Sequence, residues 1–281
     1  MIAVALGLVV ATAFGSGDWS GGRASSRAST LAVLLVAQVC SLAGAAVLVL
    51  FVSAHAHPAD IGYGAVAGAV NVVGLGLLYR SLARHAAGVV APITAVVGAL
   101  VPVVWGLAHG ERPSALALTG VALAVVAGAL IARGGESAPG TSFAPGVVPA
   151  VAAGVALGSS LVLYAETSKG SGQVPVLAGR AAAVLCMAVA VFVARRRGTL
   201  TMPTGSSRGF AVAAGLLDVA ATATLLVAVR RALLSLVAPI ASLAPGWTVL
   251  LTWIASRERL TRTQWVGIGV ALAALVCIAS G

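Results

Sequence analysis

The residues of this sequence that could do chemistry are a few polar side chains set inside long apolar stretches. Asn71 and Asp218 each lie near the middle of such a stretch, and Arg180 lies near the start of another. An amide, a carboxylate and a guanidinium can bind the polar groups of a small molecule. At membrane depth a central charge costs about 2.5–3.5 kcal/mol on insertion scales, so these residues are functional candidates. Hydrogen bonding between helices is their alternative role.

Spacing relates these polar residues to one another. A shift of 147 positions places Asn71 on Asp218, and a shift of 142 places Gln38 on Arg180. Thr222 follows Asp218 by one helical turn and would share its helix face. We expect Asn71, Asp218 and Arg180 to line one water-accessible cavity, and we expect Gln38 and Thr222 beside them. Arg180 has three open interpretations: an ion pair with Asp218, contact with an anionic substrate group, or snorkelling to the membrane surface.

Three further residues could line the cavity or allow a helix beside it to bend. Trp247 is expected either to anchor a helix at the interface or to line the cavity. Pro92 and Pro239 fall early in two apolar segments, where proline can start a helix or bend it as a hinge. Asp218 is also the candidate carrier of a coupling proton, because a carboxylate can take up and release one.

The sequence contains no motif for a cofactor, a metal ion or catalysis. His55 and His57 have only Asp60 near them as a third ligand, so a solvated loop is the expected interpretation. No phosphate-binding glycine loop, His-Glu-x-x-His pair or Gly-x-Ser-x-Gly elbow occurs. We therefore expect no cofactor and no metal site, and we expect that the protein is not an enzyme.

The elements that position these residues follow from composition. Of the 281 residues 60% are hydrophobic and 9% are charged, whereas a soluble domain carries about 25% charged residues. Lipid is the solvent that suits such a chain, and the backbone in lipid must be helical to satisfy its own polar groups. The net charge of +10 comes from arginines clustered between apolar stretches. We assign them to membrane loops near anionic lipid and expect no nucleic acid partner.

Ten apolar segments can be traced, each near the ~20 residues that a bilayer requires. Glycine and proline in residues 133–144, between the fifth and sixth segments, indicate a linker. The predicted segments are 2–17, 30–52, 61–79, 87–107, 114–132, 146–164, 174–194, 208–229, 234–255 and 263–280.

The shift of 147 positions also aligns several motifs, which indicates a duplication. It places residues 90–93 (VAPI) on 237–240 (VAPI), 111–112 (ER) on 258–259 (ER), and Gly120 on Gly267. We predict a first five-helix repeat over residues 1–136 and a second over 137–281. Because five is odd, the second repeat would enter the membrane from the opposite side, as in many transporters.

These motifs resemble the EamA branch of the drug/metabolite transporter superfamily. The resemblance rests on the two VAPI runs, on residues 110–112 (GER) and 257–260 (RERL) that follow them, and on residues 14–19 (FGSGDW). It implies an all-α membrane protein with ten transmembrane helices as two inverted five-helix repeats. It also implies secondary transport, often export of amino acids or other small metabolites, through a cavity at the centre of the bundle.

We therefore expect a secondary active transporter that exports small metabolites or amino acids by alternating access. Its partners would be a small-molecule substrate, the lipid bilayer and a candidate coupling proton, and it would be a multi-pass protein of the plasma (inner) membrane. A facilitator or a lipid-carrier flippase of the same fold is the alternative. An intramembrane enzyme and a non-transporting membrane scaffold are competing hypotheses from other functional classes. Loop charges place both termini outside the cell, whereas the resemblance implies cytoplasmic termini. Substrate, direction and oligomeric state stay open at this point.

Overall fold

The computed structural model describes residues 2–52, 54–82, 87–132, 144–196, 200–256 and 261–280. These residues form helices and no β-strand, which confirms the all-α prediction. The predicted boundary between residues 136 and 137 lies outside the described residues, as do Glu258 and Arg259. The elements are α1 Ile2–Ser25, α2 Thr30–Phe51, α3 Pro58–Leu82, α4 Ala87–Ala108, α5 Ala115–Ala132, α6 Ala144–Ala165, the 3-10 turn η1 Lys169–Ser171, α7 Val174–Arg196, α8 Gly205–Arg231, α9 Leu234–Ala241, α10 Ala244–Ser256 and α11 Arg262–Ser280.

Most of these helices are long and apolar enough to cross a membrane. Eight spans meet both criteria in the described residues, and one of them, Leu234–Ala255, takes in both α9 and α10. Helices α4 and α5 contain the shorter apolar stretches Ile93–Ala108 and Ala115–Ile131. The outward-facing side chains are apolar too, since Leu50 and Phe51 are 81% and 82% exposed. Such a surface suits lipid, so the chain is an integral multi-pass membrane protein.

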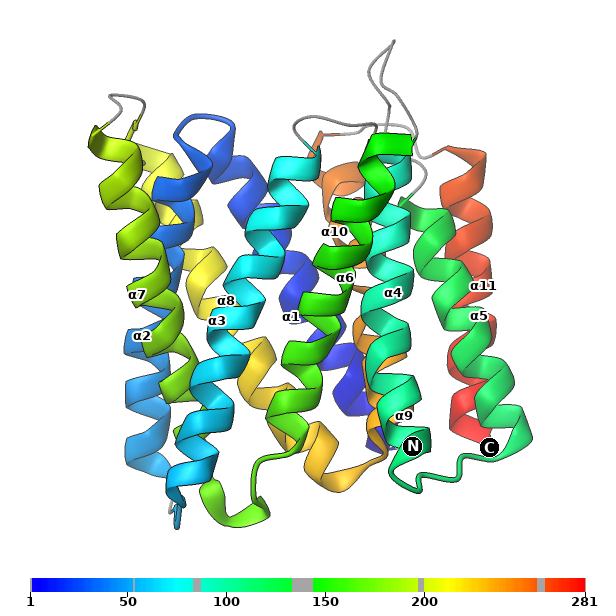
Figure 1. Cartoon of the computed structure of the whole chain (residues 1–281). Helices are drawn as coiled ribbons and strands as arrows, with labels where there is room; N and C mark the ends of the chain where they lie inside the picture. The colour runs from blue at the N-terminus through cyan, green and yellow to red at the C-terminus, as the bar shows by residue number, and fades with distance from the viewer. Residues whose placement is uncertain are drawn as a thin grey trace.

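The helices stand side by side in one bundle, and Figure 1 shows the direction of each. Both chain ends lie at the same end of the bundle, at the bottom of the view. Helix α1 rises from that end, whereas α6 begins at the opposite end and descends. Helices α2 and α7 are opposed in the same way. Residues before and after the central linker therefore start from opposite ends of the bundle.

Helices of the first half pack mainly on helices of the second. Helix α1 lies along α8, and α6 lies along α3. Helices α2 and α7 contact each other, α2 also contacts α8, and α7 also contacts α3. One buried apolar cluster joins Val10, Leu225 and Val237, and a second joins Ala67 to Val176. The core is therefore shared between the two halves.

Glycines set the closest helix contacts. Glycines four residues apart, at 64 and 68 and at 154 and 158, give small faces for close helix packing. A Cβ built on Gly154 would lie 2.7 Å from Val97 Cβ, and one on Gly158 would lie 2.7 Å from Gly98 O. At Gly68 an added Cβ would collide with the backbone of Gly179. These contacts hold α6 against α4 and α3 against α7.

The single helix predicted over 234–255 is divided in two. Helix α9 ends at Ala241 and α10 begins at Ala244. Pro239 lies inside α9, where it has no N–H to continue the helical hydrogen bonds. The Ser242 hydroxyl donates to Pro239 O at 2.7 Å, which satisfies one carbonyl that the break leaves free. The helix is therefore interrupted shortly after Pro239, between Ala241 and Ala244.

Candidate functional site

A buried ion pair joins α7 to α8. Arg180 Nη1 lies 2.5 Å from Asp218 Oδ2, and the two side chains are 5% and 27% exposed. Arg180 Nη2 donates to the Thr222 hydroxyl, and Nη1 also donates to Gln38 Oε1 at 3.4 Å. A guanidinium enclosed by these partners does not reach the membrane surface. Of the three interpretations of Arg180, snorkelling is therefore wrong and the ion pair with Asp218 is present.

Local helix geometry explains why these groups meet. Asp218 and Thr222 lie one turn apart on α8, and the Thr222 hydroxyl also donates to Asp218 O at 2.9 Å. Gly215, three residues before Asp218, lies so near to Ala37 that an added Cβ would collide with the Ala37 carbonyl. This close approach of α2 to α8 brings Gln38, the next residue of α2, to the guanidinium.

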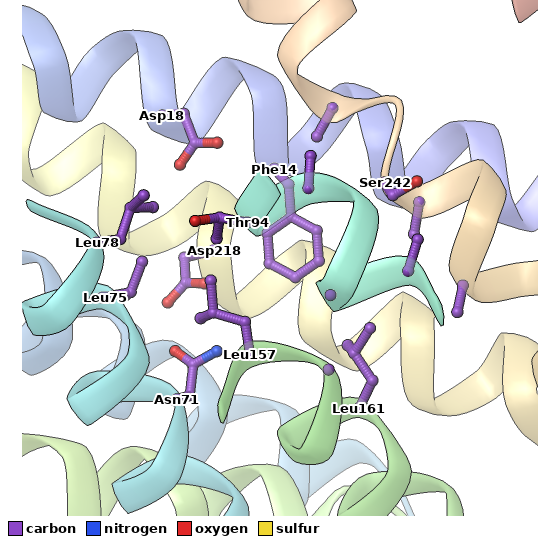
Figure 2. Close-up of a pocket in the computed structure, with 17 residues that line it drawn as sticks. Phe14, Asp18, Asn71, Leu75, Leu78, Thr94, Leu157, Leu161, Asp218 and Ser242 are labelled. Atoms are coloured by element: carbon purple, nitrogen blue, oxygen red, sulfur yellow. The ribbon is translucent and has the colours of Figure 1, made fainter. Parts of the chain in front are cut away.

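A cavity of about 380 Å³ lies beside the ion pair, between α1, α3, α4, α6 and α8 and the α9–α10 break. Figure 2 shows its lining side chains. Most of the lining is apolar, and its larger apolar side chains are Phe14, Leu75, Leu78, Leu157 and Leu161. Its polar side chains are Asp18, Asn71, Thr94, Asp218 and Ser242. An apolar chamber with a few polar groups is the usual form of a small-molecule site.

Two of the predicted site residues line this cavity and others support it. Asn71 of α3 and Asp218 of α8 both face the cavity, as Figure 2 shows. The Asn71 amide also donates to Ser160 Oγ on α6 at 3.4 Å. Arg180, Gln38 and Thr222 are not among the lining residues and lie behind Asp218 in the ion-pair network.

The remaining predicted residues lie apart from this network. Trp247 of α10 is not a lining residue, and its Nε1 donates to Ser16 Oγ on α1 at 2.8 Å. Pro239 lies between Ala238 and Ala241, both of which line the cavity. Pro92 belongs to α4, but its side chain lies outside the described residues. Trp247 therefore connects α10 to α1 by a hydrogen bond. Pro239 lies close to the α9–α10 break at the wall of the cavity.

Sequence reasoning missed Asp18 as a cavity residue. The predicted first segment covers residues 2–17, so Asp18 is expected at the end of the first helix. Helix α1 instead continues to Ser25, so Asp18 lies nearly two turns before its end. Phe14 and Asp18 are one turn apart and both line the cavity. The spacing of Phe14 and Asp18, one helical turn apart, is the feature of the sequence that could have predicted that both face the cavity.

Glu111 has a different role from the interfacial ion pair that its neighbour Arg112 suggests. Its carboxylate accepts hydrogen bonds from Leu234 N at 2.7 Å and from Ser235 N at 2.8 Å. Arg112 instead donates to the carbonyls of Leu107 and Glu111. Glu111 therefore caps the first turn of α9, where free N–H groups and the helix dipole favour a carboxylate.

The described residues hold no group of three or more His, Cys, Asp or Glu that could bind a metal ion. Asp60 accepts hydrogen bonds from His57 N at 2.8 Å, from Ser168 N at 2.6 Å and from Ser168 Oγ at 2.8 Å. These bonds fix the start of α3 against the loop after α6. The carboxylate near the two histidines is thus occupied by structural hydrogen bonds.

Comparisons with known proteins agree with this geometry. Residues 144–280 match the model of the EamA-like transporter family, which belongs to the drug/metabolite transporter superfamily. A solved crystal structure of a protein resembles the whole chain in fold, with a TM-score of 0.74 and 17% sequence identity over 99% of this chain and 97% of that chain. No curated protein matches the sequence. The resemblance inferred from the motifs is confirmed.

Proposed function

We propose that this protein is a secondary active transporter, because residues 144–280 match the model of the EamA-like transporter family of the drug/metabolite transporter superfamily. It exports small metabolites or amino acids across the plasma (inner) membrane. Its ten membrane spans form two inverted repeats, residues 1–136 and 137–281. The two repeats exchange conformations and so open the central cavity to one side of the membrane at a time.

The pairing of the helices supports the inverted repeats. If α1 to α5 correspond to α6, α7, α8, α9–α10 and α11, then exchanging the halves turns the α3–α6 contact into α8–α1. The same exchange turns α3–α7 into α8–α2 and leaves α2–α7, α4–α9 and α5–α11 unchanged, and all of these contacts occur. This is the pattern expected of a pseudo-twofold axis. The opposed directions of α1 and α6 in Figure 1 support an axis in the membrane plane.

The observation that carries the proposal is a polar pair at matched repeat positions facing one apolar cavity. Asn71 and Asp218 align at the 147-residue shift and both line the chamber. A carboxylate is costly at membrane depth, and Arg180 lowers that cost by pairing with Asp218. A structural pair could be enclosed completely, but Asp218 keeps part of its side chain open to the cavity.

The residues take different parts in the proposed mechanism. Asn71 and Asp218 contact substrate, while Arg180, Gln38 and Thr222 hold the Asp218 carboxylate in place. When Asp218 takes up the coupling proton, its ion pair with Arg180 is lost and the contact of α7 with α8 changes. Pro239 serves as a hinge beside the α9–α10 break, as Pro92 does in α4. Trp247 keeps α10 attached to α1 while the break moves.

A metabolite screen followed by flux measurements tests this function. Metabolites are compared in cells with and without the protein, and an exported compound is then loaded into proteoliposomes under an imposed proton gradient. We expect gradient-driven transport that Asp218→Asn and Arg180→Gln abolish while the protein remains monodisperse. Glu166→Gln is the matched control, because Glu166 is exposed and does not line the cavity.

Full activity in both Asp218→Asn and Arg180→Gln would contradict the proposed site. Transport that runs only down the substrate's own gradient and ignores the proton gradient would identify a facilitator. Movement of a lipid between leaflets, with no flux of soluble metabolites, would identify a flippase.

A further inference from the structure

The two carboxylates of the cavity differ in their partners. Asp218 is held by the Arg180 guanidinium at 2.5 Å and accepts a hydrogen bond from Ser41 Oγ at 3.4 Å. Asp18 has neither an ion pair nor a hydrogen-bond donor among the described residues. Of the two acidic residues in the described lining, Asp18 is therefore the one without a cationic partner.

The position of Asp18 is fixed although its carboxylate is free. Its neighbour Gly17 lies against α8, where an added Cβ would be 3.6 Å from Leu217 Cβ and 3.8 Å from Asp218 N. This contact sets the rotation of α1 and directs the next side chain toward the cavity. Asp18 is exposed, and Figure 2 shows its carboxylate among the side chains that line the cavity. A charged group held in place without a protein partner is suited to a ligand of opposite charge.

The rest of the cavity indicates what accompanies that charge. Phe14 lies one turn from Asp18 on the same face of α1, and Leu75, Leu78 and Leu157 add further apolar surface. A volume of about 380 Å³ is at the small end of the range for ligand pockets. It fits a compact molecule with one apolar body and one charged end.

We propose that Asp18 is the cation-binding carboxylate of this cavity and that its ligands are small amphiphilic ammonium compounds, the charged amine on Asp18 and the apolar body against Phe14 and the leucines. This inference rests on the proposed function, since it names the substrate class of the same cavity. It assigns charge recognition to a residue outside the Asn71–Asp218 pair. Asp218, already paired with Arg180, contributes polarity but little net charge.

Binding of two matched probes to the purified protein tests the inference. The probes are 2-phenylethylammonium and its neutral analogue 2-phenylethanol, measured by calorimetry in detergent at constant ionic strength. A charge-assisted hydrogen bond favours the cation by about tenfold or more. We expect that preference in the unaltered protein and in Asp18→Glu, which retains the charge. In Asp18→Asn the two probes should bind with equal affinity.

The neutral probe also reports folding, because it should bind Asp18→Asn as well as it binds the unaltered protein. Glu166→Gln is the matched control, since it removes one negative charge from an exposed site that does not line the cavity. It should keep the preference for the cation. Equal binding of both probes to the unaltered protein, no binding of the cation, or a preference that survives Asp18→Asn would overturn the inference. Gradient-driven export would still stand in each of these cases, because the flux assay measures it separately.

Discussion

Removing the guanidinium of Arg180 should destabilise the protein because it leaves Asp218 without its counter-charge. Breaking a buried ion pair by removing one partner costs about 3–5 kcal/mol. Asp218 is 27% exposed to the cavity, where water can solvate part of the charge, so the lower end applies. We expect Arg180→Gln to lower the free energy of unfolding by about 3 kcal/mol. At about 2–4 °C per kcal/mol, the unfolding midpoint falls by about 6–12 °C.

Asp218→Asn should cost at least as much, because the Arg180 side chain that it leaves uncompensated is only 5% exposed. The double variant Arg180→Gln/Asp218→Asn removes both charges and should be more stable than either single variant. Thermal unfolding in detergent, followed by tryptophan fluorescence, measures all four proteins as a double-mutant cycle. If the losses of the single variants simply add in the double variant, the pair is not coupled and the reasoning is refuted.

Three further predictions concern the contacts that hold the bundle together. Glu111→Ala removes the cap of α9 and should lower stability by about 1–2 kcal/mol in the same unfolding assay; an unchanged midpoint would argue against the cap. Gly68→Leu cannot fit against the α7 backbone and should abolish the monodisperse peak in size-exclusion chromatography. Gly209→Leu, whose added Cβ would meet nothing within 4 Å, should leave that peak intact. Trp247→Phe removes the hydrogen bond to Ser16 and should cost about 1 kcal/mol, and Ser16→Ala should add no further loss to it.

Much of the fold follows from apolar length and from the repeated motifs. Each predicted segment overlaps a helix of the described residues, because a helix in lipid must be apolar over about 20 residues. Eight spans are long and apolar enough to cross a membrane, and α1 runs beyond its predicted end at residue 17. Asn71 and Asp218 could be paired from the sequence because they fall at the same 147-residue offset as the repeated motifs. Their burial cost marked them as candidates before any geometry was known.

Other features of the structure depend on contacts between distant residues, which local sequence patterns do not predict. Glu111 caps a helix that begins more than a hundred residues later, so the residues around it in the sequence do not predict this contact. The α9–α10 break was not predicted from Pro239, since proline inside a membrane helix often leaves it continuous. Asp18 was missed because the predicted first segment ends at residue 17, whereas α1 continues to Ser25.

Thiol accessibility at the cavity wall tests the central claim of alternating access most directly. Ser242→Cys, in a protein whose Cys40, Cys186 and Cys277 are replaced by serine, places one thiol beside the α9–α10 break. The variant is reconstituted in oriented vesicles, and a membrane-impermeant methanethiosulfonate is added to one side or the other. The account predicts labelling from both sides, and substrate should slow it on each. Labelling from one side alone, or from neither, would contradict a cavity that opens in turn to the two faces of the membrane.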